Sequence, residues 1–389
     1  MSGIARATLL IVAVLAGYGA GVFFAAPGGI EPSATPTPQL RDTTTTATVE
    51  GEEALTTTTL ADATVVYLVW STGGLGGSLV DGLIDEFADI SIVRGDVVGL
   101  DVPEGLIPLD ALAIDPSTYG LVVPGGELEA LEVGSVALGE TSARLRGLGP
   151  GDALSIEGRP YPIAAVVPDD LVAAAEVVFH ADDPTTSVTT DRFALISTEM
   201  ARMEFERVVR AMYEGPAPLR IRAEGETPWL RHGDAVLPQV FIKDALGEFS
   251  YTRVTGASFT QSKAFRSEMI VTESVPIIGE VTCHRIIVDM LEGAMGQLLE
   301  EGLGHLVDPG GFAGCWNPRF IRSVTGTPSG ISRHAWGAAV DINAVENPMG
   351  STGAQDQRLV DIMSEWGFTW GGEWLVPDPM HFEYGIDPG

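Results

Sequence analysis

The sequence predicts an α+β protein with an N-terminal membrane segment, a β-rich region and a smaller C-terminal domain of helices and short strands. Three observations predict this class. Residues 7–26 are apolar and uncharged, and residues 63–278 consist mainly of short apolar runs separated by turn residues. Residues 279–389 combine two helical patterns with short strands. The assignments rest on the spacing of apolar residues, which repeats every two residues in strands and about every 3.6 in helices.

Composition limits the class of protein and of partner. The chain has 389 residues, which leaves room for two or three domains, and 45% of them are hydrophobic. Lys and Arg total 22 against 53 Asp and Glu, which gives a formal charge of −31. Nucleic acids and anionic membrane surfaces both require a basic face, so we expect no nucleic-acid partner. The two cysteines exclude a cysteine-rich zinc finger or an iron–sulfur protein.

Residues 1–28 form a membrane anchor or a signal segment. Arg6 precedes the uncharged run 7–26, and about 20 helical residues span a hydrocarbon core. A cleaved signal peptide is the alternative, but its apolar region is shorter and ends in a small-x-small site. Phe24 stands where that site needs a small residue, so an uncleaved anchor is favoured. In both cases Arg6 stays inside, and the rest of the chain is expected to be extracytoplasmic, or secreted if the segment is cleaved.

The exported part begins with residues 29–62, which are rich in Pro, Thr and acidic residues. Such a composition buries no core, so this stretch is predicted to be a disordered linker that holds the folded part off the membrane. Disulfides persist outside the cytoplasm, and Cys283 and Cys315 are therefore expected to form a bridge. The alternative is two separate buried thiols.

Residues 63–278 are predicted to be β-rich, as one or two modules. Residues 72–77 are rich in glycine, but their spacing departs from the dinucleotide-binding fingerprint, and a simple turn is predicted. Residues 194–214 are predicted to form a helix. The stretch 136–167 resembles part of the extracytoplasmic domain of bacterial ABC-type permeases, which implies a small β-rich module without catalysis. The sequence identifies no protein partner for this region.

The residues that carry chemistry gather in the domain formed by residues 279–389. Asp341 and His381 each lie next to an apolar residue along a short predicted strand. Neighbouring side chains of a strand point to opposite faces, so both side chains face away from the core. Together with His334 they provide two imidazoles and one carboxylate, a set that suits Zn²⁺ and leaves a fourth position for water. Zinc lowers the pKa of such a water, but a base must still take its proton. Asp378 is the nearest carboxylate without another role.

Two motifs carry a family resemblance. S-x-H-x-x-G-x-A-x-D runs from Ser332 to Asp341, and [DE]-x-x-H ends at His381. Together they resemble the D-alanyl-D-alanine carboxypeptidase (VanY-like) and L-alanyl-D-glutamate endopeptidase family of zinc cell-wall peptidases. The resemblance covers the C-terminal domain only and implies a hedgehog-like fold, a small antiparallel sheet with helices. It also implies that His334, Asp341 and His381 are the Zn²⁺ ligands.

The resemblance implies further roles. Asp378 would be the general base and then the general acid, although an aspartate here is closer to the endopeptidase branch. Either Arg319 or Arg322 would stabilise the oxyanion, with Arg319 preferred. Substrate contacts are assigned to Ser332, Trp336 and Trp374.

The resulting hypothesis is a membrane-tethered, exported zinc peptidase that cuts amide bonds in peptidoglycan stem peptides. The sequence leaves open whether it removes a terminal residue or cuts internally. The alternative hypothesis is a non-catalytic scaffold or sensor of the cell wall that works through the β-rich region.

Overall fold

A computed structural model describes residues 64–123, 125–226, 236–253, 256–321 and 330–386. The chain divides into a unit Met1–Thr59 and a compact unit Leu60–Gly389, and every described residue belongs to the second unit. The predicted membrane segment and linker lie outside the described residues. Within the described ranges, no helix has the length and apolar character needed to cross a membrane.

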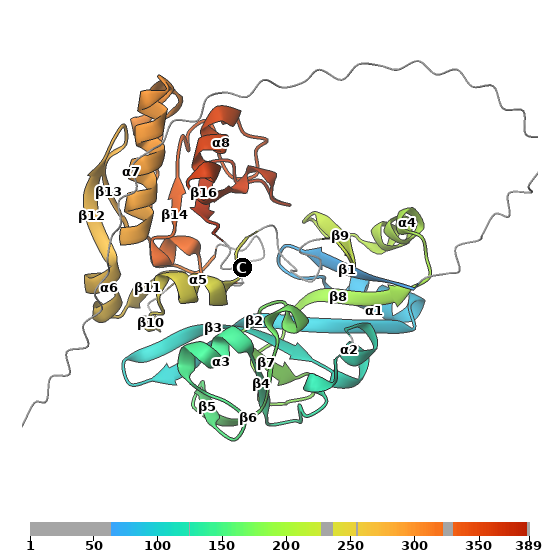
Figure 1. Cartoon of the computed structure of the whole chain (residues 1–389). Helices are drawn as coiled ribbons and strands as arrows, with labels where there is room; N and C mark the ends of the chain where they lie inside the picture. Colours follow the sequence, from blue (N-terminus) through green and yellow to red (C-terminus); the bar gives the residue numbers. More distant parts are fainter. Residues whose placement is uncertain (1–63, 124, 227–235, 254–255, 322–329, 387–389) are drawn as a thin grey trace, which may run out of the picture. The chain divides into compact units, whose positions relative to one another are not determined.

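Among the described residues, eleven strands form one mixed sheet (Figure 1). Their bounds are β1 Val65–Ser71, β2 Asp89–Val102, β3 Gly105–Ile114, β4 Val136–Gly139, β5 Ala153–Ile156, β6 Arg159–Val167, β7 Val177–His180, β8 Asp191–Thr198, β9 Leu219–Ala223, β10 Tyr251–Arg253 and β11 Phe259–Gln261. The pairing order is β11-β10-β3-β7-β4-β6-β5-β2-β8-β1-β9, and β2 also pairs with β3. This additional pairing closes six strands, from β3 through β2, into a ring.

Side chains along the ring strands alternate between a buried face and a face exposed to water. Along β5 and β6, Leu154, Ile156, Tyr161 and Ile163 are buried, whereas most of the residues between them are exposed. A strand with this period-two pattern buries one face and leaves the other in water. One hydrophobic cluster collects such residues from all six ring strands, so the ring encloses a core of its own.

Two predictions for this region have different outcomes. A turn does connect β1 to helix α1 (Gly77–Glu86), and Gly74 adopts a φ of +97° there. A Cβ at this position would lie 2.9 Å from the carbonyl oxygen of Asp191, so the close approach requires glycine. The single helix predicted over residues 194–214 is wrong in its first part. β8 occupies Asp191–Thr198, and helix α4 covers Arg202–Met212.

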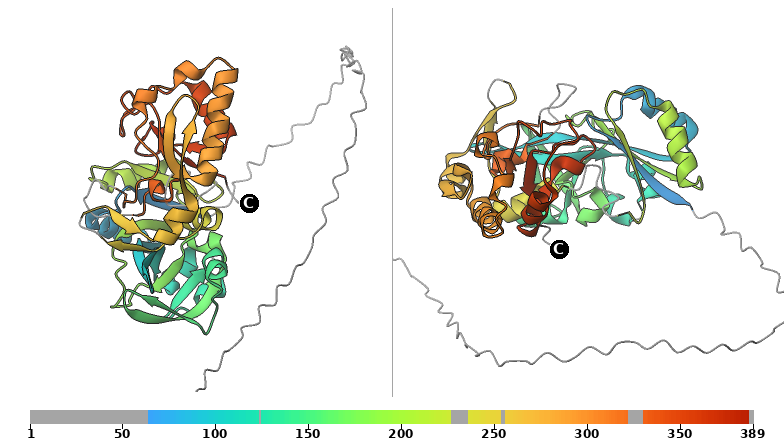
Figure 2. Two further views of the ribbon diagram at one scale, coloured as in Figure 1. Left: turned by 90° about the vertical axis from the view of Figure 1, so that its left-hand side faces the viewer. Right: turned by 90° about the horizontal axis from the view of Figure 1, so that it is seen from above.

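The C-terminal part contains a three-stranded antiparallel sheet in the order β14-β16-β15, which confirms the mixed α+β class. Its strands are β14 Ala339–Asp341, β15 Phe368–Trp370 and β16 His381–Tyr384. A separate hairpin joins β12 (Ile270–Val275) to β13 (Gly279–His284). Helix α7 (Arg285–Glu300) packs on this hairpin and on helix α8 (Gln357–Glu365), as Figure 1 and Figure 2 show.

One hydrophobic core surrounds the small sheet and extends beyond it. Val340 and Phe382 are fully buried in this core, on the strand faces that the sequence assigns to it. The same core includes Leu237 and residues of helix α5 (Gln239–Leu246). Helix α5 therefore packs against the domain that carries the candidate chemistry.

The remaining α-helices of the described residues are α2 Pro116–Val122, α3 Glu140–Arg146 and α6 Lys263–Met269.

Helix α5 also contributes to a buried cluster of charges. Lys243, one of only two lysines in the chain, is fully buried, and its Nζ lies 2.7 Å from Oε1 of the equally buried Glu176. Arg146 of α3 contacts the same oxygen at 2.9 Å. Gln239 donates a hydrogen bond to Oε2 of Glu176 at 2.7 Å. A buried charge requires such partners, so the cluster ties α5 to the ring.

This cluster predicts a pH dependence of stability. Burial alone raises the pKa of Glu176, but the charges of Lys243 and Arg146 outweigh burial and hold this pKa below its ordinary value of 4.5. A depressed carboxyl pKa contributes stability above the unfolded value, and this contribution is lost as the pH falls through the folded value. We therefore expect the free energy of unfolding to fall below about pH 4.5 more steeply in the wild type than in Glu176→Gln. Urea titrations at several acidic pH values measure this difference, and parallel pH profiles would contradict it.

Candidate metal centre

Strand pairing brings two of the predicted ligands together. In the antiparallel pair of β14 and β16, Asp341 stands directly opposite His381. Val340 and Phe382 fill the other face, so the carboxylate and the imidazole extend from the same side of the sheet. The Asp341 Oδ1 to His381 Nδ1 distance is 3.1 Å.

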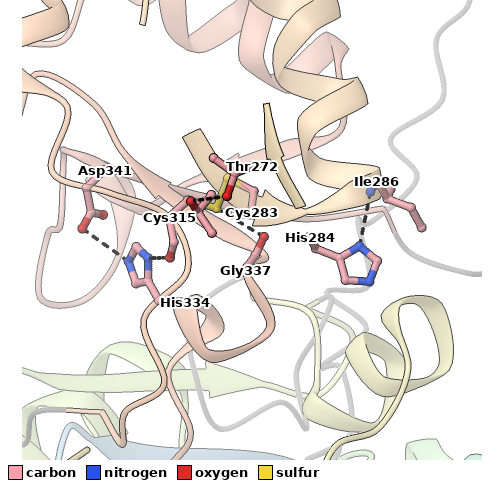
Figure 3. The surroundings of a disulfide bond; sticks show 9 residues. Thr272, Cys283, His284, Ile286, Cys315, His334, Gly337 and Asp341 are labelled. Carbon is pink, nitrogen blue, oxygen red and sulfur yellow. Dashed lines mark hydrogen bonds and ion pairs between the residues drawn. A yellow bond between two sulfur atoms is a disulfide. The ribbon is translucent and has the colours of Figure 1, made fainter. Parts of the chain in front are cut away.

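The third predicted ligand comes from a short 3-10 helix, Arg333–Trp336. Gly337 follows this helix with a φ of +64°, which lets the chain turn into β14. A Cβ there would lie 2.5 Å from the backbone nitrogen of His284, so glycine also allows this close approach. His334 is buried, and its Nδ1 lies 2.7 Å from the Cys315 carbonyl oxygen. A carbonyl only accepts, so Nδ1 carries the proton and Nε2 presents its lone pair. That Nε2 lies 3.3 Å from Oδ2 of Asp341 (Figure 3).

The carbonyl that orients His334 is itself held in place. Cys315 forms a disulfide with Cys283 of β13, with a Cα–Cα distance of 5.4 Å (Figure 3). The next backbone N–H, of Trp316, donates to the Thr282 carbonyl at 3.0 Å. On the other side, the N–H of Asp341 donates to the carbonyl of Gly314 at 3.1 Å. The pair of cysteines expected from the sequence thus braces the segment behind His334.

His381 lies between two carboxylates. Its Nδ1 faces Asp341, and its Nε2 lies 3.1 Å from Oε2 of Glu383. Burial alone lowers the pKa of His381, but hydrogen bonds to the two carboxylates outweigh burial and raise it to about 10. Burial alone also raises the pKa of Asp341, but its interactions with the two histidines outweigh burial and hold this pKa well below its ordinary value.

The three side chains could hold a metal ion. One ligand atom from each of His334, Asp341 and His381 lies within 4.8 Å of the others. The buried Nε2 of His334 has no hydrogen-bond partner, which is costly for a buried nitrogen unless it binds something else. Two imidazole nitrogens and one carboxylate oxygen are a donor set typical of catalytic zinc sites. The residues present therefore fit Zn²⁺.

Asp378 lies beside this centre. Its N–H donates to the Gly371 carbonyl at 2.9 Å, and its own carbonyl accepts from the N–H of His381 at 3.0 Å. The Oδ1 atom of Asp378 is buried without a hydrogen-bond partner. Burial raises the pKa of Asp378, and the charges of all three predicted ligands also act on it. An unpaired carboxylate oxygen at this position is suited to accepting a proton.

The other predicted site residues have different environments. The charge of Arg319 lowers the pKa of Asp378. Arg322 lies outside the described residues. The Ser332 backbone N–H donates to the carbonyl of Arg319 at 3.1 Å, and this serine immediately precedes the 3-10 helix. The Trp374 ring centroid is 5.1 Å from that of His381, and its indole N–H is buried without a partner.

The substrate contact expected for Trp336 requires correction. Its side chain is fully buried, packs on Phe249 with ring centroids 4.7 Å apart, and donates its indole N–H to the Gly247 carbonyl. A side chain without exposed surface contacts no substrate in this conformation, so Trp336 belongs to the core.

Glu383, whose Oε2 lies 3.1 Å from Nε2 of His381, is not among the residues predicted from the sequence. This glutamate is buried and lies on the same face of β16 as the histidine, two residues earlier. The alternation of side chains along a strand could have indicated this residue, because an acidic residue between Phe382 and Tyr384 must share the face of His381.

A family model matches this part of the chain. Residues 325–384 match the D-alanyl-D-alanine carboxypeptidase family. The match includes His334, Asp341, Asp378 and His381 and confirms the resemblance to cell-wall carboxypeptidases drawn from the motifs. Arg319 and the disulfide lie before the region matched to this carboxypeptidase family.

No curated protein sequence matches the chain. The periplasmic region of MacB from Actinobacillus actinomycetemcomitans is 11% identical, with a TM-score of 0.30, and the match covers 42% of this chain and 90% of that one. The extracellular domain of the ABC-type transporter YknZ from Gram-positive bacteria is 13% identical, with a TM-score of 0.29, over 40% of this chain and 99% of that one. Likenesses at these TM-scores carry no conclusion about fold or function.

Proposed function

We propose that the protein is a zinc-dependent peptidase that hydrolyses an amide bond in peptidoglycan stem peptides. The observation that carries this proposal is the cluster of His334, Asp341 and His381, whose ligand atoms lie within 4.8 Å of one another. The match of residues 325–384 to the carboxypeptidase family supports the substrate class. In this proposal the C-terminal domain, residues 279–389, has the hedgehog-like fold of that family.

The surrounding residues have separate tasks in this reaction. A bound Zn²⁺ supplies a Lewis acid and lowers the pKa of water. Asp378 takes the proton from the attacking water and returns it to the leaving amine. Arg319 stabilises the negative charge that develops on the carbonyl oxygen. The partly exposed Trp374 ring borders the substrate, and the buried Ser332 supports this side of the site from its position immediately before the helix that carries His334.

The proposed location follows from the N-terminal sequence. The uncharged run 7–26 anchors the chain, and residues 29–62 tether the folded part at the outer face of the membrane. A formal charge of −31 does not hinder this arrangement, because the substrate is a short peptide reached from a tether.

Digestion of peptidoglycan tests the proposal. Full-length protein in mild detergent is loaded with zinc and incubated with purified peptidoglycan, and the products are identified by mass spectrometry. We expect cleavage by the wild type and none by His334→Ala, which loses a ligand. Release of a terminal D-alanine would identify a carboxypeptidase, and cleavage beside L-alanine or within a crosslink would identify an endopeptidase. A zinc-loaded wild type without product would contradict the proposal and favour a wall-binding scaffold.

A further inference from the structure

We propose that Glu383, braced by Arg333, is a positioning residue that sets the tautomer and ring orientation of His381 for metal binding. This inference rests on the proposed zinc site, but it assigns a function to two residues that do not themselves bind the metal. Glu383 and Arg333 both lie outside the set of ligands and catalytic groups.

Both ring nitrogens of His381 face carboxylates. The Nε2 of His381 lies 3.1 Å from Oε2 of Glu383, and both side chains are buried. Nδ1 lies at the same distance from Oδ1 of Asp341, which is a predicted ligand, whereas Glu383 is not one. A carboxylate only accepts hydrogen bonds, so Glu383 holds a proton on Nε2, and Nδ1 is the nitrogen that would give up its proton to a metal beside Asp341. Carboxylates behind ligating histidines fix the ring and raise its basicity in many metal sites.

Arg333 lies beside the carboxylate of Glu383. Its Oε1 lies 3.8 Å from Nε of Arg333 and has no hydrogen-bond partner, so the guanidinium compensates its charge without a direct hydrogen bond. The same arginine donates from Nη2 to the carbonyl of Leu237. A buried carboxylate without a compensating cation is costly, and Arg333 reduces this cost.

The backbone links Arg333 to a metal ligand. Arg333 and His334 are consecutive residues of one short 3-10 helix. His334 faces Asp341, whereas Arg333 reaches the carboxylate behind His381. A displacement of this helix would therefore move one ligand directly and the other through Glu383. The geometry couples two histidines that come from distant parts of the chain.

Zinc affinity is the measurement that tests the inference. We compare full-length wild type, Glu383→Gln and Glu383→Leu by competition with a chelator of known affinity. Leucine removes the acceptor at similar size and is expected to weaken zinc binding about 10–100-fold. Glutamine keeps an acceptor oxygen and should restore most of that loss. Arg333→Met should weaken binding several-fold, and Arg358→Met, which removes an exposed arginine paired with Asp356, should have no effect.

A second readout separates positioning from a purely structural role. The thermal midpoint of each zinc-free variant is measured beside its zinc affinity, and the visible spectrum of the Co²⁺-loaded protein reports ligand geometry. Positioning predicts an altered Co²⁺ spectrum and weaker zinc binding in Glu383→Leu without a matching fall in the zinc-free midpoint. Wild-type zinc affinity in Glu383→Leu, or affinities that merely follow the midpoints, would overturn this inference alone. A wild type that binds no zinc would overturn the proposed function as well.

Discussion

Replacement of Asp378 by asparagine is expected to reduce hydrolysis of stem peptides by roughly 10²–10⁴-fold while zinc binding stays at the wild-type level. Asparagine has nearly the same size and keeps the backbone hydrogen bonds to Gly371 and His381. It does not take up the proton that the buried, unpaired Oδ1 of Asp378 is placed to accept. Initial rates on released stem peptides, with zinc content measured on the same samples, check this prediction.

Asp361 provides a matched control for this substitution. It lies exposed on α8, where its side chain accepts a hydrogen bond from Gln357, so Asp361→Asn should hydrolyse the peptides at the wild-type rate. Wild-type turnover by zinc-loaded Asp378→Asn would show that another group transfers the proton. Loss of zinc from Asp378→Asn would instead show that Asp378 supports the metal site.

The second large effect is expected on stability. Lys243→Met should lower the free energy of unfolding by about 3 kcal/mol, because removal of one partner leaves a buried carboxylate poorly compensated. We expect a loss at the low end of the range usual for a broken buried ion pair, because Arg146 still contacts Glu176 at 2.9 Å. Denaturant unfolding at neutral pH measures the change.

A double-variant cycle shows whether the loss arises from this pair. Glu176→Gln in the background of Lys243→Met removes the uncompensated charge and keeps an acceptor for Gln239, so much of the stability should return. Lys263→Met, at the other lysine of the chain, changes an exposed side chain and should have little effect. Equal losses in the single and double variants would contradict a role for the ion pair.

The candidate site was predictable to the extent that local patterns describe it. Strand alternation indicated that Asp341 and His381 face away from the core, and the motif spacing joined them to His334. The register that places Asp341 opposite His381 was not predictable, because the two residues are 40 positions apart and pair through the tertiary fold.

Long-range packing explains the features that local sequence patterns do not predict. Residues 193–196 are fully buried in the middle of a sheet, and a short apolar run of this kind has no period that separates strand from helix. Trp336 belongs to a tryptophan-rich region, but only the fold shows that Phe249, nearly ninety positions earlier, covers its ring. The closure of the ring by β2 and β3 likewise depends on pairings between distant strands.

The core shared by Leu237, α5 and the small sheet has a consequence for protein engineering. Carbonyls at the end of α5 accept hydrogen bonds from His284 and Trp336, so this helix completes the support beneath the ligand-bearing segment. A chimaera that transfers the metal centre to another protein must therefore include the chain from Leu237 onwards. When the genes of related proteins are recombined, a junction before Leu237 takes both sides of these contacts from the same parent. A junction within α5 takes the two sides from different parents.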